Sequence, residues 1–421
     1  MLTIRFGEKI HLRKKFKIIK LRILVISQYF YPENFRINDL CLGLKEQGHK
    51  VSVLTSKPNY PKGIFFKGYT FFGKSIDIYK GIKVYRSPII TRGNASGIRL
   101  FINYISFVIF GILRTLLINE KFDKILVYAP SPITVGYVGA FASFKLKAKA
   151  YLWVHDLWPE SVKDAGGIKN KFILQLVNLM TKSIYFFYKT ILVQSPYFKE
   201  YLIEQGVKES KIIYYPYYAE DYYKIVPKKE EIKSLYGNGL NFIFAGNVGI
   251  AQSFDTIIDA AILLKKRPID FNFVIIGDGR DRKRVEGKIS KYFLENNFKF
   301  LGSHPPEKMS DFFACADALI VSLKDTKIFS MTIPGKLQSY LASGKPIIAS
   351  LNGIGAKIIK DSNSGLVSNA EDPVSLADSI LRFSQLSKED RDKLGINARK
   401  YFEKEFQRSR LLKRLIDIFE K

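Results

Sequence analysis

Hydrophobic positions along the chain follow two patterns, which are short continuous apolar runs and longer stretches where apolar residues recur every three or four positions. The runs are typical of fully buried strands, and the longer stretches are typical of helices that cover a sheet. In the first half, the predicted strands are 22–29, 50–56, 81–87, 124–130, 150–156 and 189–195. The alternation predicts an α/β fold built on a parallel sheet with helices on both faces.

A polar, turn-rich stretch that contains PKKEEIKSLYGNG interrupts this pattern, and the same alternation then starts again. The predicted strands after it are 241–247, 271–279, 298–303, 318–323 and 345–350. The expected organisation is a basic tail (1–20), a Rossmann-like domain (21–215), a linker (216–239), a second Rossmann-like domain (240–400) and a C-terminal helix (401–421). Because doubly wound sheets bind ligands beyond the carboxyl ends of their strands, two such domains predict a cleft between them.

The net charge of the chain favours certain classes of binding partner but does not choose among them. The 421 residues include 67 Lys and Arg against 39 Asp and Glu, a net charge of +28. This excess favours nucleic acid, an anionic membrane leaflet or diphosphate substrates. Cys41 and Cys315 have neither a paired nor a metal-ligand spacing. We therefore expect a reducing compartment and no structural zinc.

Two segments bear on location. The basic tail 1–20 lacks the apolar core of a signal peptide, so secretion is not expected. Segment 100–113, LFINYISFVIFGIL, meets Arg114 before it reaches the roughly 18 to 20 apolar residues of a spanning helix. It predicts a helix that either packs on the sheet or lies on a membrane surface.

Two glycine-rich turns follow predicted strands of the second domain, AGNVG at 245–249 and GDGRDR at 277–282. Free backbone amides at such a turn, ahead of a helix, stabilise a diphosphate. A tight turn that needs glycine only for its backbone is the alternative. The candidate donor-binding residues are Gly246, Asn247, Gly249, Gln252, Gly277, Asp278, Gly279 and Arg280.

The segment TIPGKLQSYLASGKPIIAS has a Pro-Gly turn that opens a predicted helix, which ends at Gly344 and leads into a strand. Lys336 in the first turn and the nearby amides are expected to hold phosphates, although a solvated surface lysine is the alternative. This segment adds Thr332, Ile333, Pro334, Lys336 and Ser339 to the donor-binding candidates.

WVHDLWPES places His155 and Asp156 at a strand's carboxyl end, beside both tryptophans of the chain. A histidine at this place is a catalytic candidate, although a structural histidine fits the same pattern. The loop YFYPENFRIND follows the first strand and supplies Glu33, Asn34 and Arg36, and Asn34 is also a candidate helix cap. These three residues and Asp156 are candidate site residues of the first domain.

Many ordered phrases, among them SQYFYPENFRINDL, WVHDLWPES, FAGNVGIAQSFDTI, FLGSHPPEKM and TIPGKLQSYLASGKPIIASLNG, resemble glycosyltransferase family 4. The resemblance is greatest to the bacterial O-antigen and capsule N-acetyl-L-fucosaminyl transferases, and it extends from about Ile23 to about Phe402. It implies a GT-B fold, a nucleotide-sugar donor on the C-terminal domain, an acceptor on the N-terminal domain, retention at the anomeric carbon, and no obligatory metal or other cofactor. His155 matches the family's histidine near the transferred sugar. With the acceptor on the N-terminal domain, the residues assigned to the acceptor are Glu33, Asn34, Arg36 and Asp156.

The chain departs from the wider family in three places. Asn247 and Gln252 stand where the family has an Arg and a Lys, which leaves Arg280, Lys336 and backbone amides to neutralise the diphosphate. Met331 and Ser339 stand where the family has two glutamates, and 31–34 replaces a glycine-rich loop. A 6-deoxy N-acetyl sugar offers fewer hydroxyls than a hexose, which fits the loss of a carboxylate.

The expected function is transfer of N-acetyl-L-fucosamine, or a related 6-deoxy N-acetyl sugar, from a UDP donor to a polyprenyl-diphosphate-linked saccharide. The enzyme is expected to be cytoplasmic and peripheral on the anionic inner leaflet, in O-antigen or capsule synthesis. One alternative is a non-hydrolysing UDP-sugar epimerase, which needs a pair of carboxyl groups in the cleft. The other is a non-catalytic basic membrane-surface module. Nucleic acid is not expected, because no motif for binding it is recognisable.

Overall fold

The computed structural model describes residues 20–164 and 167–421. Within them, the N-terminal domain has an eight-stranded sheet of order β3-β4-β2-β1-β5-β6-β7-β8, in which only β3 is antiparallel to its neighbour. Its strands are β1 (Arg22–Ile26), β2 (Lys50–Ser56), β3 (Ile76–Tyr79), β4 (Ile82–Ser87), β5 (Lys124–Ala129), β6 (Lys149–Val154), β7 (Thr190–Val193) and β8 (Ile212–Tyr214).

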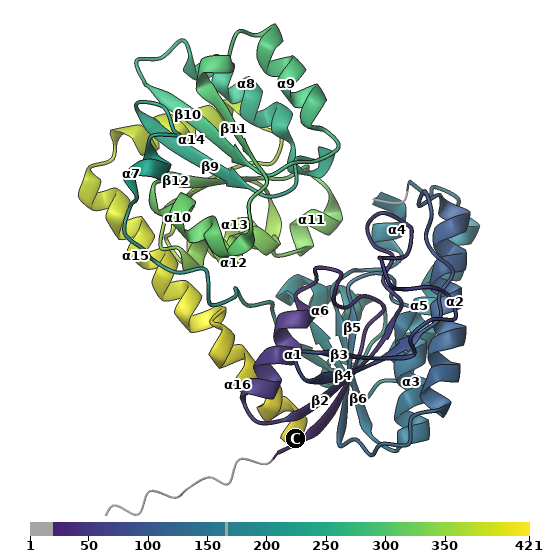
Figure 1. Cartoon of the computed structure of the whole chain (residues 1–421). Helices are drawn as coiled ribbons and strands as arrows, with labels where there is room; N and C mark the ends of the chain where they lie inside the picture. Colours follow the sequence, from purple (N-terminus) through teal and green to yellow (C-terminus); the bar gives the residue numbers. More distant parts are fainter. Residues whose placement is uncertain (1–19, 165–166) are drawn as a thin grey trace, which may run out of the picture.

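Helices cover both faces of this sheet (Figure 1). One face packs against α2 (Gly97–Leu116), α3 (Val135–Leu146), α5 (Lys171–Phe186) and α6 (Pro196–Glu204). The other face packs against α1 (Ile37–Glu46) and the last helix of the chain, α16 (Arg408–Glu420). A short α4 (Glu160–Asp164) follows β6.

The C-terminal domain has a parallel sheet of order β11-β10-β9-β12-β13-β14. Its strands are β9 (Leu240–Ala245), β10 (Phe271–Ile276), β11 (Phe298–Gly302), β12 (Ala318–Ser322), β13 (Ile347–Ser350) and β14 (Gly365–Ser368). One face packs against α8 (Phe254–Leu264), α9 (Arg282–Lys291) and α14 (Pro373–Gln385). The other packs against α10 (Met309–Ala314), α12 (Gly335–Ala342), α13 (Gly353–Asp361) and α15 (Lys388–Glu405), and α7 (Glu230–Lys233) and α11 (Lys327–Met331) complete the domain.

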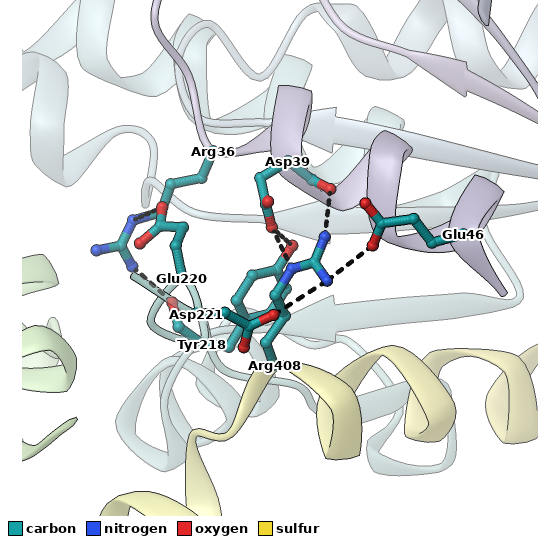
Figure 2. A network of polar contacts seen from close by, with 7 residues as sticks. All are labelled: Arg36, Asp39, Glu46, Tyr218, Glu220, Asp221 and Arg408. Atoms are coloured by element: carbon teal, nitrogen blue, oxygen red, sulfur yellow. Dashed lines mark hydrogen bonds and ion pairs between the residues drawn. The ribbon is translucent and has the colours of Figure 1, made fainter. Parts of the chain in front are cut away.

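The chain passes between the two domains twice, and the two connecting segments lie side by side. The Ala219 N–H donates to the Phe406 carbonyl at 3.2 Å, so the outgoing segment lies against the returning one. Arg408 then begins α16 and pairs with Asp39 of α1 at 2.8 Å, and also with Glu46 and Asp221 (Figure 2). The C-terminal helix is therefore fastened to the N-terminal domain.

Every strand predicted from the apolar runs is present. β2 has the predicted bounds, and the others are one to three residues shorter than predicted. The strands β3, β8 and β14 were not predicted, because each has only three or four residues and is at most partly buried along much of its length. Residues 401–421 hold the end of α15 and all of α16.

The prediction that 100–113 is too short for a membrane span is wrong, because α2 extends beyond it at both ends to 20 residues. By length and composition, α2 is the one helix in 20–164 and 167–421 that meets the requirement for crossing a membrane. Only 22% of its most apolar 18-residue window is buried.

Candidate active site

A cavity of about 550 Å³ lies where β9, β10 and β11 end and α12 begins. Arg36 of the N-terminal domain closes it on one side, so both domains contribute to its wall. Seven residues assigned to the site from sequence line this cavity: Arg36, Gly246, Asn247, Gly277, Asp278, Lys336 and Ser339. The carboxyl ends of parallel strands thus form the ligand-sized opening that a doubly wound fold predicts.

The glycine turns after β9 and β10 pack directly on each other. Gly246 and Gly277 both have φ +138°, and a Cβ on Gly277 would lie 1.9 Å from the Gly246 carbonyl oxygen. A Cβ on Gly279 would lie 2.1 Å from the Val248 carbonyl oxygen. Glycine is required here for backbone reasons, and the same geometry leaves backbone at the cavity surface. The structural and the ligand-binding interpretations of these turns are therefore compatible.

Lys336 is a half-buried cation in the cavity wall. Its Nζ donates to Gln252 Oε1 at 2.5 Å and lies 3.6 Å from the centre of the Phe244 ring. Burial lowers the pKa of this ammonium to about 7. Among the described residues it has no carboxylate partner, which leaves its charge available to an anion. Gln252 lies outside the lining and acts through this bond.

The start of α12 differs in detail from the sequence prediction. The helix begins at Gly335, so Gly335 and Lys336 line the cavity. Ile333 and Pro334 are buried in the domain core instead, and the Thr332 hydroxyl donates back to the Ile328 carbonyl at 2.7 Å. These three residues position the helix and do not reach the cavity.

The other predicted donor contacts lie at or beyond the cavity's edge. Gly249 and Gly279 belong to the turns, where each packs on the Asn247 side chain. Arg280 is exposed and forms no ion pair with a described residue. Met331, in the place of a family glutamate, packs into the apolar core of the N-terminal domain, and its carbonyl accepts from Ser195 Oγ at 2.5 Å. Met331, which replaces the glutamate, thus makes a contact between the two domains.

Arg36 connects the two domains at the cavity. Its guanidinium donates to the Gly335 carbonyl at 2.8 Å and to the Tyr218 carbonyl at 3.2 Å. Figure 2 shows its ion pair with Glu220. Arg36 Nε lies 3.6 Å from Glu220 Oε1, and the guanidinium carbon lies 5.2 Å from the centre of the Tyr217 ring. The side chain assigned to acceptor binding therefore reaches the donor domain.

Arg36 and His155 both contact the ring of Tyr217. His155 follows β6, is 8% exposed, and stacks on Tyr217 with ring centres 4.2 Å apart. Trp153 and Tyr128 complete the aromatic surroundings at 4.1 and 4.7 Å. Neither ring nitrogen has a hydrogen-bond partner among the described residues. Burial holds the pKa of the imidazole well below its usual value, so the ring is neutral. His155 is not one of the residues that line the cavity.

Glu33 and Asn34 were predicted to contact the acceptor, and the structure gives them other surroundings. The Glu33 carboxylate is buried and accepts from the backbone amides of Phe30, Asn59 and Tyr60. Burial raises its pKa to about 7. It shapes the loop and is not free for a direct contact. Asn34 is exposed and does not cap α1.

Asp156 lies in a polar corner next to His155. Its carboxylate accepts from Ser161, and burial raises its pKa. Nearby, the rings of Tyr104 and Trp158 lie 6.2 Å apart, and Arg92 lies 4.9 Å from the centre of the Tyr60 ring. This aromatic and basic surface on the N-terminal domain was not predicted.

Sequence reasoning also missed the far wall of the cavity, which carries Tyr223, Ser303, His304, Pro306, Met309, Phe313 and Tyr340. Most of these come from the phrase GSHPPEKM after β11 and from α10. The available signal was a small, polar turn after a third parallel strand, next to two glycine turns. Within the described residues, no group of three His, Cys, Asp or Glu side chains is placed to hold a metal ion.

Two Rossmann-like domains with a cavity at their strand ends form the GT-B fold. Residues 35–216 match the family described as Glycosyltransferase Family 4, and residues 226–401 match the family described as Glycosyl transferases group 1. The chain is therefore a glycosyltransferase that carries the domains of both families.

Relatives and solved structures agree with this assignment. The chain is 26% identical over 351 residues to the uncharacterized glycosyltransferase MJ1178 of Methanocaldococcus jannaschii, covering 82% of this chain and 86% of that one. It is 22% identical to the putative colanic acid biosynthesis glycosyl transferase WcaI of Escherichia coli, covering 77% and 82%. Sucrose-phosphate synthase of Thermosynechococcus elongatus has a similar structure, with TM-score 0.72, 16% identity and coverage of 95% and 98%. Anabaena HepE in complex with UDP and glucose has TM-score 0.66, 15% identity and coverage of 95% and 99%.

Proposed function

We propose that the enzyme transfers a 6-deoxy N-acetyl sugar, N-acetyl-L-fucosamine or a close relative, from a UDP donor to a lipid-diphosphate-linked saccharide in the synthesis of a surface polysaccharide. The observation that carries the donor assignment is Lys336, which has no carboxylate partner within 20–164 and 167–421 and lies among the glycine turns after β9 and β10 and the start of α12. An anion is the ligand that such a site stabilises.

The cavity offers separate surfaces for the parts of a nucleotide sugar. The diphosphate lies at the glycine turns beside Lys336, and the base lies against the apolar wall of Pro306, Met309 and Phe313. The sugar then extends toward Arg36 and His155. HepE binds UDP in a structure of the same fold, which supports UDP as the donor nucleotide.

In the reaction, the bond between the anomeric carbon and the diphosphate oxygen breaks, and its electron pair stays with the diphosphate. A bond to the acceptor hydroxyl oxygen forms on the same face of the sugar, and the proton of that hydroxyl passes to the departing diphosphate oxygen. Negative charge grows on the departing diphosphate, where Lys336 and backbone amides stabilise it. His155, as a neutral imidazole, orients the sugar. The acceptor approaches over the Tyr60, Arg92 and Tyr104 surface, with retention at the anomeric carbon.

The sugar and acceptor are inferred from the family departures and from the relatives. Met331 and Ser339 remove the carboxylates that bind extra hydroxyls, and WcaI is named for colanic acid biosynthesis. An epimerase requires two carboxyl groups facing the sugar, whereas Asp278 is the one carboxylate among the cavity-lining residues that the structure describes.

The test is a donor screen with the purified enzyme and a polyprenyl-diphosphate-linked N-acetylhexosamine, read by mass spectrometry. The expected product gains the mass of one 6-deoxy N-acetylhexose from the UDP donor. Transfer of an ordinary hexose only, or transfer from a donor with another base, would contradict the proposal. A Lys336→Met variant should form product much more slowly with the same donor.

A further inference from the structure

The outer face of the N-terminal domain is formed by α2, α3 and α5, which lie on the opposite side of the sheet from α16 (Figure 1). Large apolar side chains on this face are exposed to solvent. Among them, Phe101 and Ile109 of α2 are 64% and 52% exposed, Phe144 of α3 is 83%, and Phe172 and Leu179 of α5 are 68% and 60%. We call these three helices' outward surface the apolar helix face.

Helix α2 buries several polar side chains and exposes large apolar ones, which is the reverse of the pattern on a surface helix of a water-soluble domain. The side chains it buries include the polar Asn103, Ser106 and Thr115. Asn103 accepts from Gln28 at 2.9 Å, and Ser106 Oγ accepts from the Ile90 amide at 3.0 Å. These bonds fix which side faces the sheet. The apolar side is therefore the outer one by construction.

Helix α5 also exposes large apolar side chains, although it buries both polar and apolar ones. Its buried residues are Thr181, Ile184 and Tyr185, whereas its N-terminal half exposes Phe172, Leu176 and Leu179. Exposed apolar area on this scale is rare on a monomer and marks an interaction surface.

Charge on the same helices identifies the partner. α2, α3 and α5 contain no Asp or Glu, and their charged residues are Arg99, Arg114, Lys145, Lys171 and Lys182. A second copy of the chain would bring these cations against one another. An anionic lipid surface pairs with them, and each cation near such a surface contributes about 1 kcal/mol.

We propose that the apolar helix face docks on an anionic bilayer, with α2 and α5 lying in the headgroup region and their apolar side chains reaching the acyl chains. α2 lies along the surface and does not span it, because spanning would break its bonds to Gln28 and Ile90. The docking itself does not depend on the proposed function, but its connection to a lipid-linked acceptor rests on that function. Tyr104 on α2 lies beside Trp158, so the docked face borders the proposed acceptor surface.

The experiment measures co-sedimentation of the full chain with vesicles of phosphatidylglycerol and phosphatidylcholine at 0.5 M salt, where charge attraction is screened over about 4 Å. We compare the parent with the variant Phe101→Ser/Ile109→Ser/Leu113→Ser. Each of these side chains is at least half exposed, so the fold does not depend on them. The expected result is a partition coefficient at least about tenfold lower for the variant, since burying a large apolar side chain is strongly favourable.

The matched control is Phe293→Ser/Val374→Ser/Ile396→Ser, which changes three apolar residues of the C-terminal domain that are at least as exposed. This variant should bind vesicles as the parent does. Equal binding by parent and α2 variant would overturn the inference. So would a variant that binds vesicles normally but changes from dimer to monomer in sedimentation, because the face would then bind a second copy. Transfer to a short water-soluble acceptor should be unchanged in the α2 variant, and this separates failure of docking from failure of the proposed reaction.

Discussion

At the scale of single residues, the charge state of Lys336 is set by its surroundings. Its Nζ lies between the Phe244 ring and Gln252 Oε1, and burial lowers its pKa to about 7. A bound diphosphate places negative charge beside this amine and raises its pKa again. Donor binding above pH 7 must therefore take up a proton.

This proton uptake is the first prediction. At pH 8, where phosphate groups with a second pKa near 6 are fully ionised, UDP binding should take up about one proton in the parent and almost none in Lys336→Gln. Calorimetry in two buffers of different ionisation enthalpy measures it. The affinity of the parent should fall up to about tenfold per pH unit above pH 7. Equal uptake by both proteins would assign the proton to another group.

The second prediction concerns His155, whose ring nitrogens have no partner among the described residues. His155→Ala should lower kcat by at least about tenfold, because a positioned polar group at a reacting centre commonly contributes 10²-fold or more. His155→Phe keeps the stacking on Tyr217 and removes only the polar atoms. If His155→Phe turns over like the parent, the residue has only a packing role.

The local sequence pattern was enough to predict candidate site residues whose position is set by their own strand, turn or helix. Gly246, Gly277 and Lys336 lie at strand or helix ends, where the amino-acid types themselves indicate an anion site. Residues that meet only through tertiary structure were not predictable in this way. Glu33 is an example, because the backbone amides of Asn59 and Tyr60 that bind it come from another loop.

At the scale of elements, the close packing of the β9 and β10 turns makes the third prediction. Gly277→Ala forces a Cβ toward the Gly246 carbonyl at a φ of +138°. It should lower UDP affinity at least about tenfold and the free energy of unfolding by about 1–3 kcal/mol. Gly287→Ala in α9 is the control, since nothing lies within 4 Å of its added Cβ. The control should leave UDP affinity unchanged in the same titration, and a Gly277→Ala protein that binds UDP normally would remove the turns from the donor site.

Element type was predictable where an apolar run was long, and orientation was not. The sequence of α2 reads as an apolar helix whichever side faces the sheet, so its burial remained open between packing and membrane contact. The polar contacts of Asn103 and Ser106 determine which side of α2 faces the sheet. Their partners, Gln28 and Ile90, lie in other segments of the chain, after strands β1 and β4.

At the scale of the whole molecule, the two domains are held by contacts on both sides of the cavity. On one side, Met331 and Ile328 of α11 enter the apolar core of the N-terminal domain. On the other, α16 crosses back and lies against α1, so that the C-terminal end of the chain belongs structurally to the first domain. Arg408 stands where the returning chain meets that domain (Figure 2).

The last prediction follows from this position. Arg408 is 11% exposed in its side chain and pairs with Asp39 at 2.8 Å, whereas Glu46 and Asp221 are mostly exposed partners that contribute little. Arg408→Gln leaves Asp39 without its guanidinium, so local opening of α16 should become easier by about 1–3 kcal/mol. Amide hydrogen exchange of residues 408–420 measures this opening directly. Arg410→Gln, two residues further on the exposed side of the same helix, is the control and should exchange as the parent does. If both variants protect α16 equally, the helix is held by its apolar contacts alone, and the ion pairs drawn around Arg408 have no part in joining the domains.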